Sequence, residues 1–203
     1  MKKTIFIFII TLLSCFGHYT HAQTEKGKRL IGATTSLNAG IIEHSRVRDN
    51  VSTLSERITR FSLTPHAGYF IKDNLALGAQ LSVSFSNTKD YDYDSELRET
   101  NLAFSPFIRY YFGTKKVRPL VHVSGGIGSY KDKYIASSSP NYNRESTSTL
   151  FCYSIGVGAG VFLNDMVSID LELGYGGISS KINEDLRGRQ NAFGFNAGFS
   201  FFF

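Results

Sequence analysis

The stretch Asn191–Phe203, with the sequence NAFGFNAGFSFFF, decides the fold of this chain. One parity of the stretch is almost entirely aromatic, and it consists of Phe193, Phe195, Ala197, Phe199, Phe201 and Phe203. The other parity is mostly small or polar, and no charge interrupts either set. A period of two is typical of a β-strand, because successive side chains point to opposite faces. We therefore predict a strand with one bulky apolar face and one small face.

Seven earlier stretches alternate in the same way, which brings the count to eight. They cover residues 29–43, 57–72, 75–86, 100–112, 118–130, 149–163 and 167–176. The connections between them alternate in length. Short ones lie near 72–74, 113–117 and 164–166, and long polar ones cover 44–56, 87–99, 131–148 and 177–190. Short turns at one end and longer loops at the other are typical of an outer-membrane barrel with both termini at the short-turn end.

The choice between a membrane barrel and a soluble barrel depends on which face points inward. In a soluble barrel the large face lies inside and the outer face meets water, where Lys and Glu are common. The small faces of 75–86, 149–163 and 191–203 carry no charge. Their Gly, Ser, Ala, Asn and Gln fit the narrow interior of eight strands. We therefore predict an all-β, eight-stranded antiparallel transmembrane β-barrel with its large face toward lipid.

The first 22 residues have the pattern of a signal peptide. A short basic head precedes an apolar run of about ten residues, which is too short to span a bilayer. Small residues predict cleavage after Ala22, leaving a short segment 23–28 before the barrel domain 29–203. The alternative is a lipoprotein signal, because residues 12–15 (LLSC) loosely fit a lipobox. No apolar run of 18 residues follows, so we expect no transmembrane helix.

Composition argues against two other classes of protein. The net charge of +5 is a mild surplus without the clustered basic face of a nucleic-acid binder. Of the two cysteines, Cys15 lies in the leader, so Cys152 has no partner for a disulfide. We expect Cys152 to be a small buried filler within a strand.

Two predicted hairpins resemble a known family. The residues that carry the resemblance are 68–78 (GYFIKDNLALG), 106–112 (PFIRYYF) and 118–121 (RPLV). They resemble strand-turn-strand segments of the small outer-membrane β-barrel domain family, often called porin-like and similar in shape to OmpA/OmpX-type barrels. The resemblance covers nearly all of the mature chain. It implies an integral protein of the bacterial outer membrane and gives no catalytic residues to transfer. The expected orientation places the loops outside the cell and the termini in the periplasm.

Seven polar or charged side chains fall on the small face and form a predicted lumen cluster. They are Arg60, His66, Gln80, Arg109, His122, Asp170 and Glu172. Buried charges need partners, so we expect salt bridges that fill and close the barrel. The alternative is a small or gated porin-like ion path.

Two further motifs could carry chemistry. Asp90, Asp92 and Asp94 alternate in the most charged loop and could offer oxygens to Ca²⁺. Their spacing departs from the EF-hand pattern, and a solvated loop or continued strands are the alternatives. His122-Val123-Ser124 resembles the His-x-Ser pair of lipid A deacylase barrels, although its parity places both side chains in the lumen. We therefore expect a protein without enzymatic activity, metal or cofactor, and treat lipid A modification as a lesser alternative.

The expected partners follow from the membrane assignment. They are outer-membrane lipids and lipopolysaccharide, together with the barrel-assembly machinery, which would contact Phe199, Phe201 and Phe203 of the closing strand. We expect a monomer with a structural or surface-interaction role. Pro65 and Pro106 cannot donate to a ladder from within their strands, so we also expect a local bulge near each.

Overall fold

The computed structural model describes residues 24–36, 40–48, 51–136, 143–181 and 187–203. The predicted signal peptide lies outside these residues. The strands are β1 (Arg29–Ser36), β2 (Gly40–Arg48), β3 (Val51–Lys72), β4 (Leu75–Asp90), β5 (Ser95–Tyr111), β6 (Val117–Ala136), β7 (Arg144–Phe162), β8 (Val167–Lys181) and β9 (Arg187–Phe202). No helix among the described residues has the length and apolar character needed to cross a membrane.

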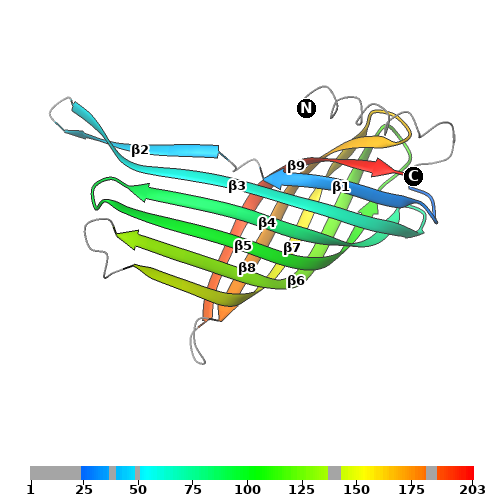
Figure 1. The fold of residues 1–203 in the computed structure, drawn as a ribbon. Helices are drawn as coiled ribbons and strands as arrows, with labels where there is room; N and C mark the ends of the chain where they lie inside the picture. Colours follow the sequence, from blue (N-terminus) through cyan, green and yellow to red (C-terminus); the bar gives the residue numbers. More distant parts are fainter. Residues whose placement is uncertain (1–23, 37–39, 49–50, 137–142, 182–186) are drawn as a thin grey trace, which may run out of the picture.

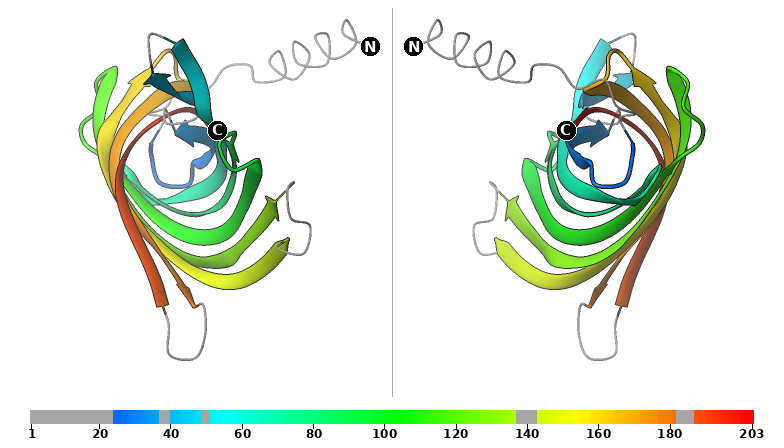
Figure 2. Two further views of the ribbon diagram at one scale, coloured as in Figure 1. Left: turned by 90° about the vertical axis from the view of Figure 1, so that its left-hand side faces the viewer. Right: turned by 90° about the vertical axis from the view of Figure 1, so that its right-hand side faces the viewer.

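The strands form a closed antiparallel barrel (Figures 1 and 2). Strand β1 closes it, because Ala33 pairs with Phe199 of β9 on one side and with Pro65 of β3 on the other. Each strand from β3 to β8 pairs with the strand that follows it in the chain. The ring therefore has eight strands, β1 and β3 to β9, as predicted, while β2 pairs with the outer part of β3. The single first strand predicted over 29–43 is divided into β1 and β2.

The strands run further toward the long-loop end than predicted. Only Tyr91–Asp94 separates β4 from β5, although the predicted loop covered 87–99. The prediction of long loops was wrong in this respect, because it took the loss of apolar residues for the end of the strand. Backbone pairing continues through these polar residues, as in Asn87↔Arg98 and Lys89↔Glu96, so the strands extend past the apolar band.

The prediction of a bulge at each proline was also wrong. The β3–β4 pairing resumes at His66↔Gln80 in the same register as Leu63↔Val83, and the β5–β6 pairing continues likewise across Pro106. Each proline leaves a two-residue gap in the pairing without a shift. A missing N–H donor removes one step of the ladder, but it does not require an extra residue.

The two faces of the barrel wall have the predicted orientation. Large apolar side chains point outward along every strand, and Leu81 and Ile169 are 41% and 42% exposed. At the short-turn end the lumen holds an aromatic layer of interlocked side chains, which we define as Leu30, Phe70, Tyr111, Leu120, Phe162 and Phe202. Asn74 adopts a left-handed φ of 66° in the tight turn between β3 and β4, a conformation that asparagine tolerates well. The carboxyl terminus lies at this same end (Figure 1).

Candidate functional site

Four of the predicted lumen residues meet in one buried group directly above the aromatic layer. We call Arg109, His122, Asp170 and Glu172 the ionic cluster. Arg109 donates from Nη1 to Asp170 Oδ2 at 3.1 Å and from Nη2 to Glu172 Oε1 at 2.9 Å. His122 Nδ1 lies 3.2 Å from Glu172 Oε2. Arg109 is 1% exposed and Asp170 is fully buried, whereas His122 and Glu172 also border a cavity of the lumen.

Glycines on β7 explain how side chains of β6 and β8 meet across an intervening strand. His122 on β6 pairs with Gly156, and Glu172 on β8 pairs with Gly158. A Cβ at Gly158 would lie 3.0 Å from Glu172 Cγ, and one at Gly160 would lie 3.2 Å from Asp170 Oδ1. The absence of side chains on β7 therefore leaves the space that the ionic cluster occupies.

His66 joins the cluster indirectly. Its Nε2 lies 3.3 Å from Ser200 Oγ, and Ser200 donates to Asp170 Oδ2 at 2.6 Å. Ser168 donates to the other oxygen of Asp170 at 2.7 Å. The ring of Phe107 packs edge-on against both His66 and His122, at centroid distances of 6.1 and 5.3 Å. These contacts satisfy both oxygens of the fully buried Asp170 carboxylate.

The amino-terminal segment before β1 packs beneath the aromatic layer. Thr24 is 2% exposed and accepts a hydrogen bond of 2.7 Å from Arg118 Nη1. The Arg118 guanidinium lies 4.2 Å from the centre of the Phe162 ring, a cation–π contact. The backbone N–H of Gly27 also donates to the carbonyl of Phe70 at 2.9 Å. This segment is therefore docked onto the short-turn end of the barrel.

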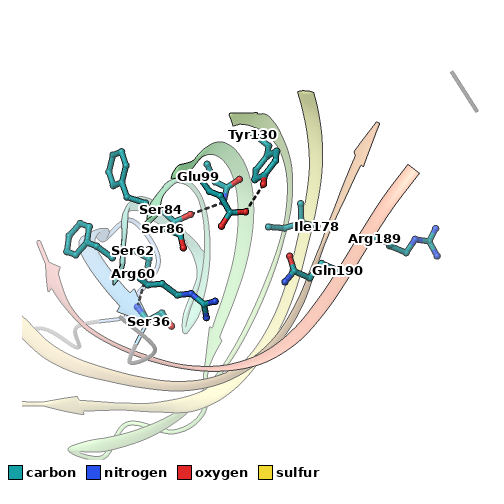
Figure 3. Close-up of a pocket in the computed structure, with 13 residues that line it drawn as sticks. Ser36, Arg60, Ser62, Ser84, Ser86, Glu99, Tyr130, Ile178, Arg189 and Gln190 are labelled. Carbon is teal, nitrogen blue, oxygen red and sulfur yellow. Dashed lines mark hydrogen bonds between the residues drawn. The ribbon is translucent and has the colours of Figure 1, made fainter. Parts of the chain in front are cut away.

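Above the ionic cluster the lumen is hollow. Cavities of about 480, 440 and 170 Å³ share Ser36 as a lining residue, and the smallest is also lined by His122, Glu172 and Gln80. Hydroxyl and amide side chains dominate the walls, and Gln80 donates to Ser124 Oγ at 3.2 Å. Arg60 is exposed and lines the largest cavity near the long-loop end, far along β3 from His66 (Figure 3). Arg60 and Gln80 thus stand apart from the ionic cluster.

The motifs considered for metal binding and catalysis form no assembled site in the described residues. Asp90 Oδ1 accepts the backbone N–H groups of Asp92 and Tyr93 at 2.9 and 3.1 Å, so this carboxylate closes the β4–β5 turn. No group of three or more potential metal ligands occurs in the described part of the chain. Ser124 Oγ lies 2.8 Å from Ser154 Oγ, whereas His122 contacts Glu172.

Phe199, Phe201 and Phe203 of the closing strand point outward and are 48%, 36% and 38% exposed. Their predicted contact with the assembly machinery stays a prediction. Sequence reasoning missed the contributions of Ser168, Ser200 and Phe107. The alternate glycines over 156–160 were the available signal, because small residues on one strand allow its neighbours to meet.

A closed ring of eight strands with a lipid-facing apolar surface and a polar interior defines the class of outer-membrane β-barrels. The sequence matches the outer membrane protein beta-barrel domain over residues 8–201, and the chain belongs to this family. It is therefore an integral protein of the bacterial outer membrane.

Solved structures with the same fold are distant in sequence. A major outer membrane protein from Thermus thermophilus is 12% identical with a TM-score of 0.51, covering 87% of this chain and 99% of that one. Ail, the attachment invasion locus protein of Yersinia pestis, in complex with the heparin analogue sucrose octasulfate, is 12% identical with a TM-score of 0.50, covering 88% and 99%. No curated protein matches the sequence significantly. At these identities the likeness concerns the fold alone.

Proposed function

We propose that this protein is a non-conducting outer-membrane barrel with a structural or surface-interaction role. The observation that carries the proposal is the position of Arg109, which is fully buried between two carboxylates. The aromatic layer lies directly beneath it, with ring centroids of Phe162 and Phe202 only 5.0 Å apart. Two successive layers, one ionic and one aromatic, thus oppose the passage of water and ions through the lower lumen.

The orientation that goes with this function places the long-loop end outside the cell. The short turns and both ends of the barrel domain lie on the other side, as expected for insertion from the periplasm. The β4–β5, β6–β7 and β8–β9 hairpins then present extended polar strands to the medium. Thiol labelling of intact cells tests this orientation, because Tyr93→Cys is expected to react while Lys115→Cys is protected until the cells are opened.

Planar-bilayer recording of the purified protein tests the closure. We expect no large, stable conductance steps from the wild type, and steady open steps would contradict the proposal. The triple variant R109M/D170N/E172Q removes the charges but keeps the aromatic layer, so it is also expected to stay closed. Adding Phe70→Ala and Phe202→Ala to this variant removes large parts of both layers and is expected to produce conductance.

The second candidate function is a small or gated channel. The hollow above the ionic cluster supports it, because water and small solutes would reach His122 and Glu172 from the long-loop end. Under this alternative the charges alone hold the gate shut, so the triple variant without aromatic changes would conduct. The same recording therefore distinguishes the two functions.

A further inference from the structure

Five basic residues recur on the outer face of the barrel, in the parts of the strands nearer the long-loop end. We define the basic belt as Arg57 on β3, Lys89 on β4, Arg98 on β5, Lys131 on β6 and Arg189 on β9. Each stands four positions toward the long-loop end from an exposed apolar residue of its own strand. These apolar residues are Phe61, Phe85, Leu102, Ile127 and Phe193. An even spacing keeps both members of each pair on the outward face.

On each of these five strands, one residue of the same parity lies between the apolar residue and the basic residue, and it is neutral and polar. These residues are Thr59, Asn87, Thr100, Ser129 and Asn191. The outer surface therefore changes from apolar to neutral polar to basic over four residues, on five of the eight strands of the ring. A rise of about 3.3 Å per residue makes this about 13 Å along each strand. A membrane lipid changes in the same order, from acyl chains through ester, amide or sugar groups to phosphates.

The charges of the basic belt are only partly balanced within the protein. Arg57 donates to Glu43, and Lys131 lies 2.6 Å from Glu145, where its hydrogen bond lowers the pKa of the Glu145 carboxyl. Arg98 donates to Glu96 at 2.9 Å. These pairs are exposed, and exposed ion pairs are weak enough for another anion to share or replace them.

Two members of the basic belt make no ion pair with another described residue, namely Lys89 and Arg189. Lys89 is the direct cross-strand partner of Arg57 on one side and of Glu96 on the other, and Arg98 is the partner of Lys133. Like charges directly opposite each other destabilise a sheet, and the three carboxylates of Glu43, Glu96 and Glu145 offset only part of the five positive charges of the basic belt. Arg189 borders the largest of the three cavities, and Figure 3 shows its side chain on the opposite side of β9 from that of its neighbour Gln190. All five residues of the basic belt are exposed.

We propose that the basic belt binds the phosphate groups of a phosphorylated, multiply acylated glycolipid in the outer leaflet. The acyl chains lie against the apolar level, the neutral polar residues meet the sugar and its amide or ester links, and the basic side chains bind the phosphates. The placement in the outer leaflet rests on the orientation proposed above. The binding chemistry itself does not, because it depends only on the outer surface.

Binding to the purified full chain in mild detergent tests the belt. The probes are lipid A bearing two phosphates and the same lipid A without phosphates, titrated and counted by native mass spectrometry. The belt variant is R57Q/K89Q/R98Q/K131Q/R189Q. The matched control K26Q/R29Q/K72Q/K115Q/K116Q removes the same number of charges from exposed positions at the short-turn end. Heat-modifiable migration on gels verifies that both variants are folded.

We expect the belt variant to bind phosphorylated lipid A about tenfold more weakly, or worse, while the control keeps wild-type affinity. The lipid without phosphates should bind wild type and belt variant equally. Equal losses in belt variant and control, or no preference of the wild type for phosphates, would overturn the proposal. Failure of the intact-cell labelling would instead reject the orientation, and large conductance would reject the closure, so the three outcomes are separate.

Discussion

At the scale of single residues, Arg109 is the buried cation that pairs with two buried carboxylates. Its guanidinium is 1% exposed and forms ion pairs with two buried carboxylates, those of Asp170 and Glu172. Removing one partner of a buried ion cluster leaves the other charges unpaired in a medium of low dielectric. The geometry therefore makes this side chain important for the stability of the fold.

Arg109→Met is expected to lower the free energy of unfolding by about 3–5 kcal/mol, since Asp170 and Glu172 lose their cation. Urea titration of the refolded protein in phospholipid vesicles measures the effect. The variant R109M/D170N/E172Q removes all three charges and should recover most of the loss. Arg98→Gln serves as the exposed comparison, and it is expected to have little or no effect on stability because exposed ion pairs contribute little. Equal costs at positions 98 and 109 would contradict the role given to burial.

Parity placed Arg109, His122, Asp170 and Glu172 on the inner face, but it did not predict which of them touch. The prediction also omitted Arg118, which is buried, and Glu99, which lines the largest of the three cavities. Arg109 and His122 are direct cross-strand partners. Asp170 and Glu172 reach them only because β7 is lined by glycine there. Arg60 has the same parity as the cluster, yet it lies near the long-loop end. These residues differ in how far along their strands they lie from the short-turn end, and an alternating pattern does not indicate that position.

At the scale of elements, β7 shows how a strand without side chains organises its neighbours. Gly158 faces the lumen between its cross-strand partners Leu120 and Glu172, and a Cβ there would meet the Leu171 carbonyl oxygen and the Glu172 side chain. Gly194 on β9 also faces the lumen, but a Cβ there would meet nothing within 4 Å. Two glycines of similar exposure to the lumen thus differ in what surrounds them.

Gly158→Ala is expected to destabilise the barrel by about 1–3 kcal/mol, because the added methyl group displaces Glu172 or shifts β8. Gly194→Ala should be nearly neutral. The same urea titration compares the two variants, and heat-modifiable migration on gels gives the folded fraction of each. If both substitutions cost the same, the spacing role of β7 is refuted.

The existence and parity of the eight barrel strands could be predicted from alternation, since a slip of one residue would turn every side chain to the wrong face. The ends of the strands could not. Apolar alternation stops where the lipid stops, while backbone pairing continues into the region of the basic belt, as in β3 with its 22 residues. The division of β1 from β2 likewise has no counterpart in the hydrophobic pattern.

At the scale of the whole molecule, one distribution of side chains accounts for both the fold and the location of the protein. Bulky side chains cover the outside, small and polar ones fill the inside, and the closed ring leaves no strand edge to the hydrocarbon. The lumen is then layered from aromatic to ionic to hollow along its length. The distribution of side chains between the outside and the inside could be predicted from composition and from the period of two. The layering of the lumen could not, because it depends on the register between strands.

Thiol accessibility in bilayers tests most directly whether the bulky side chains face lipid. In a Cys152→Ser background, Leu81→Cys and Ile169→Cys are placed on the outward face, and Tyr93→Cys is placed at the 77% exposed tip of the β4–β5 hairpin. A membrane-impermeant, water-soluble maleimide is predicted to label position 93 within minutes and to leave positions 81 and 169 unmodified until detergent is added. Rapid labelling of positions 81 and 169 in intact bilayers would show that the large face meets water, and the account would be contradicted.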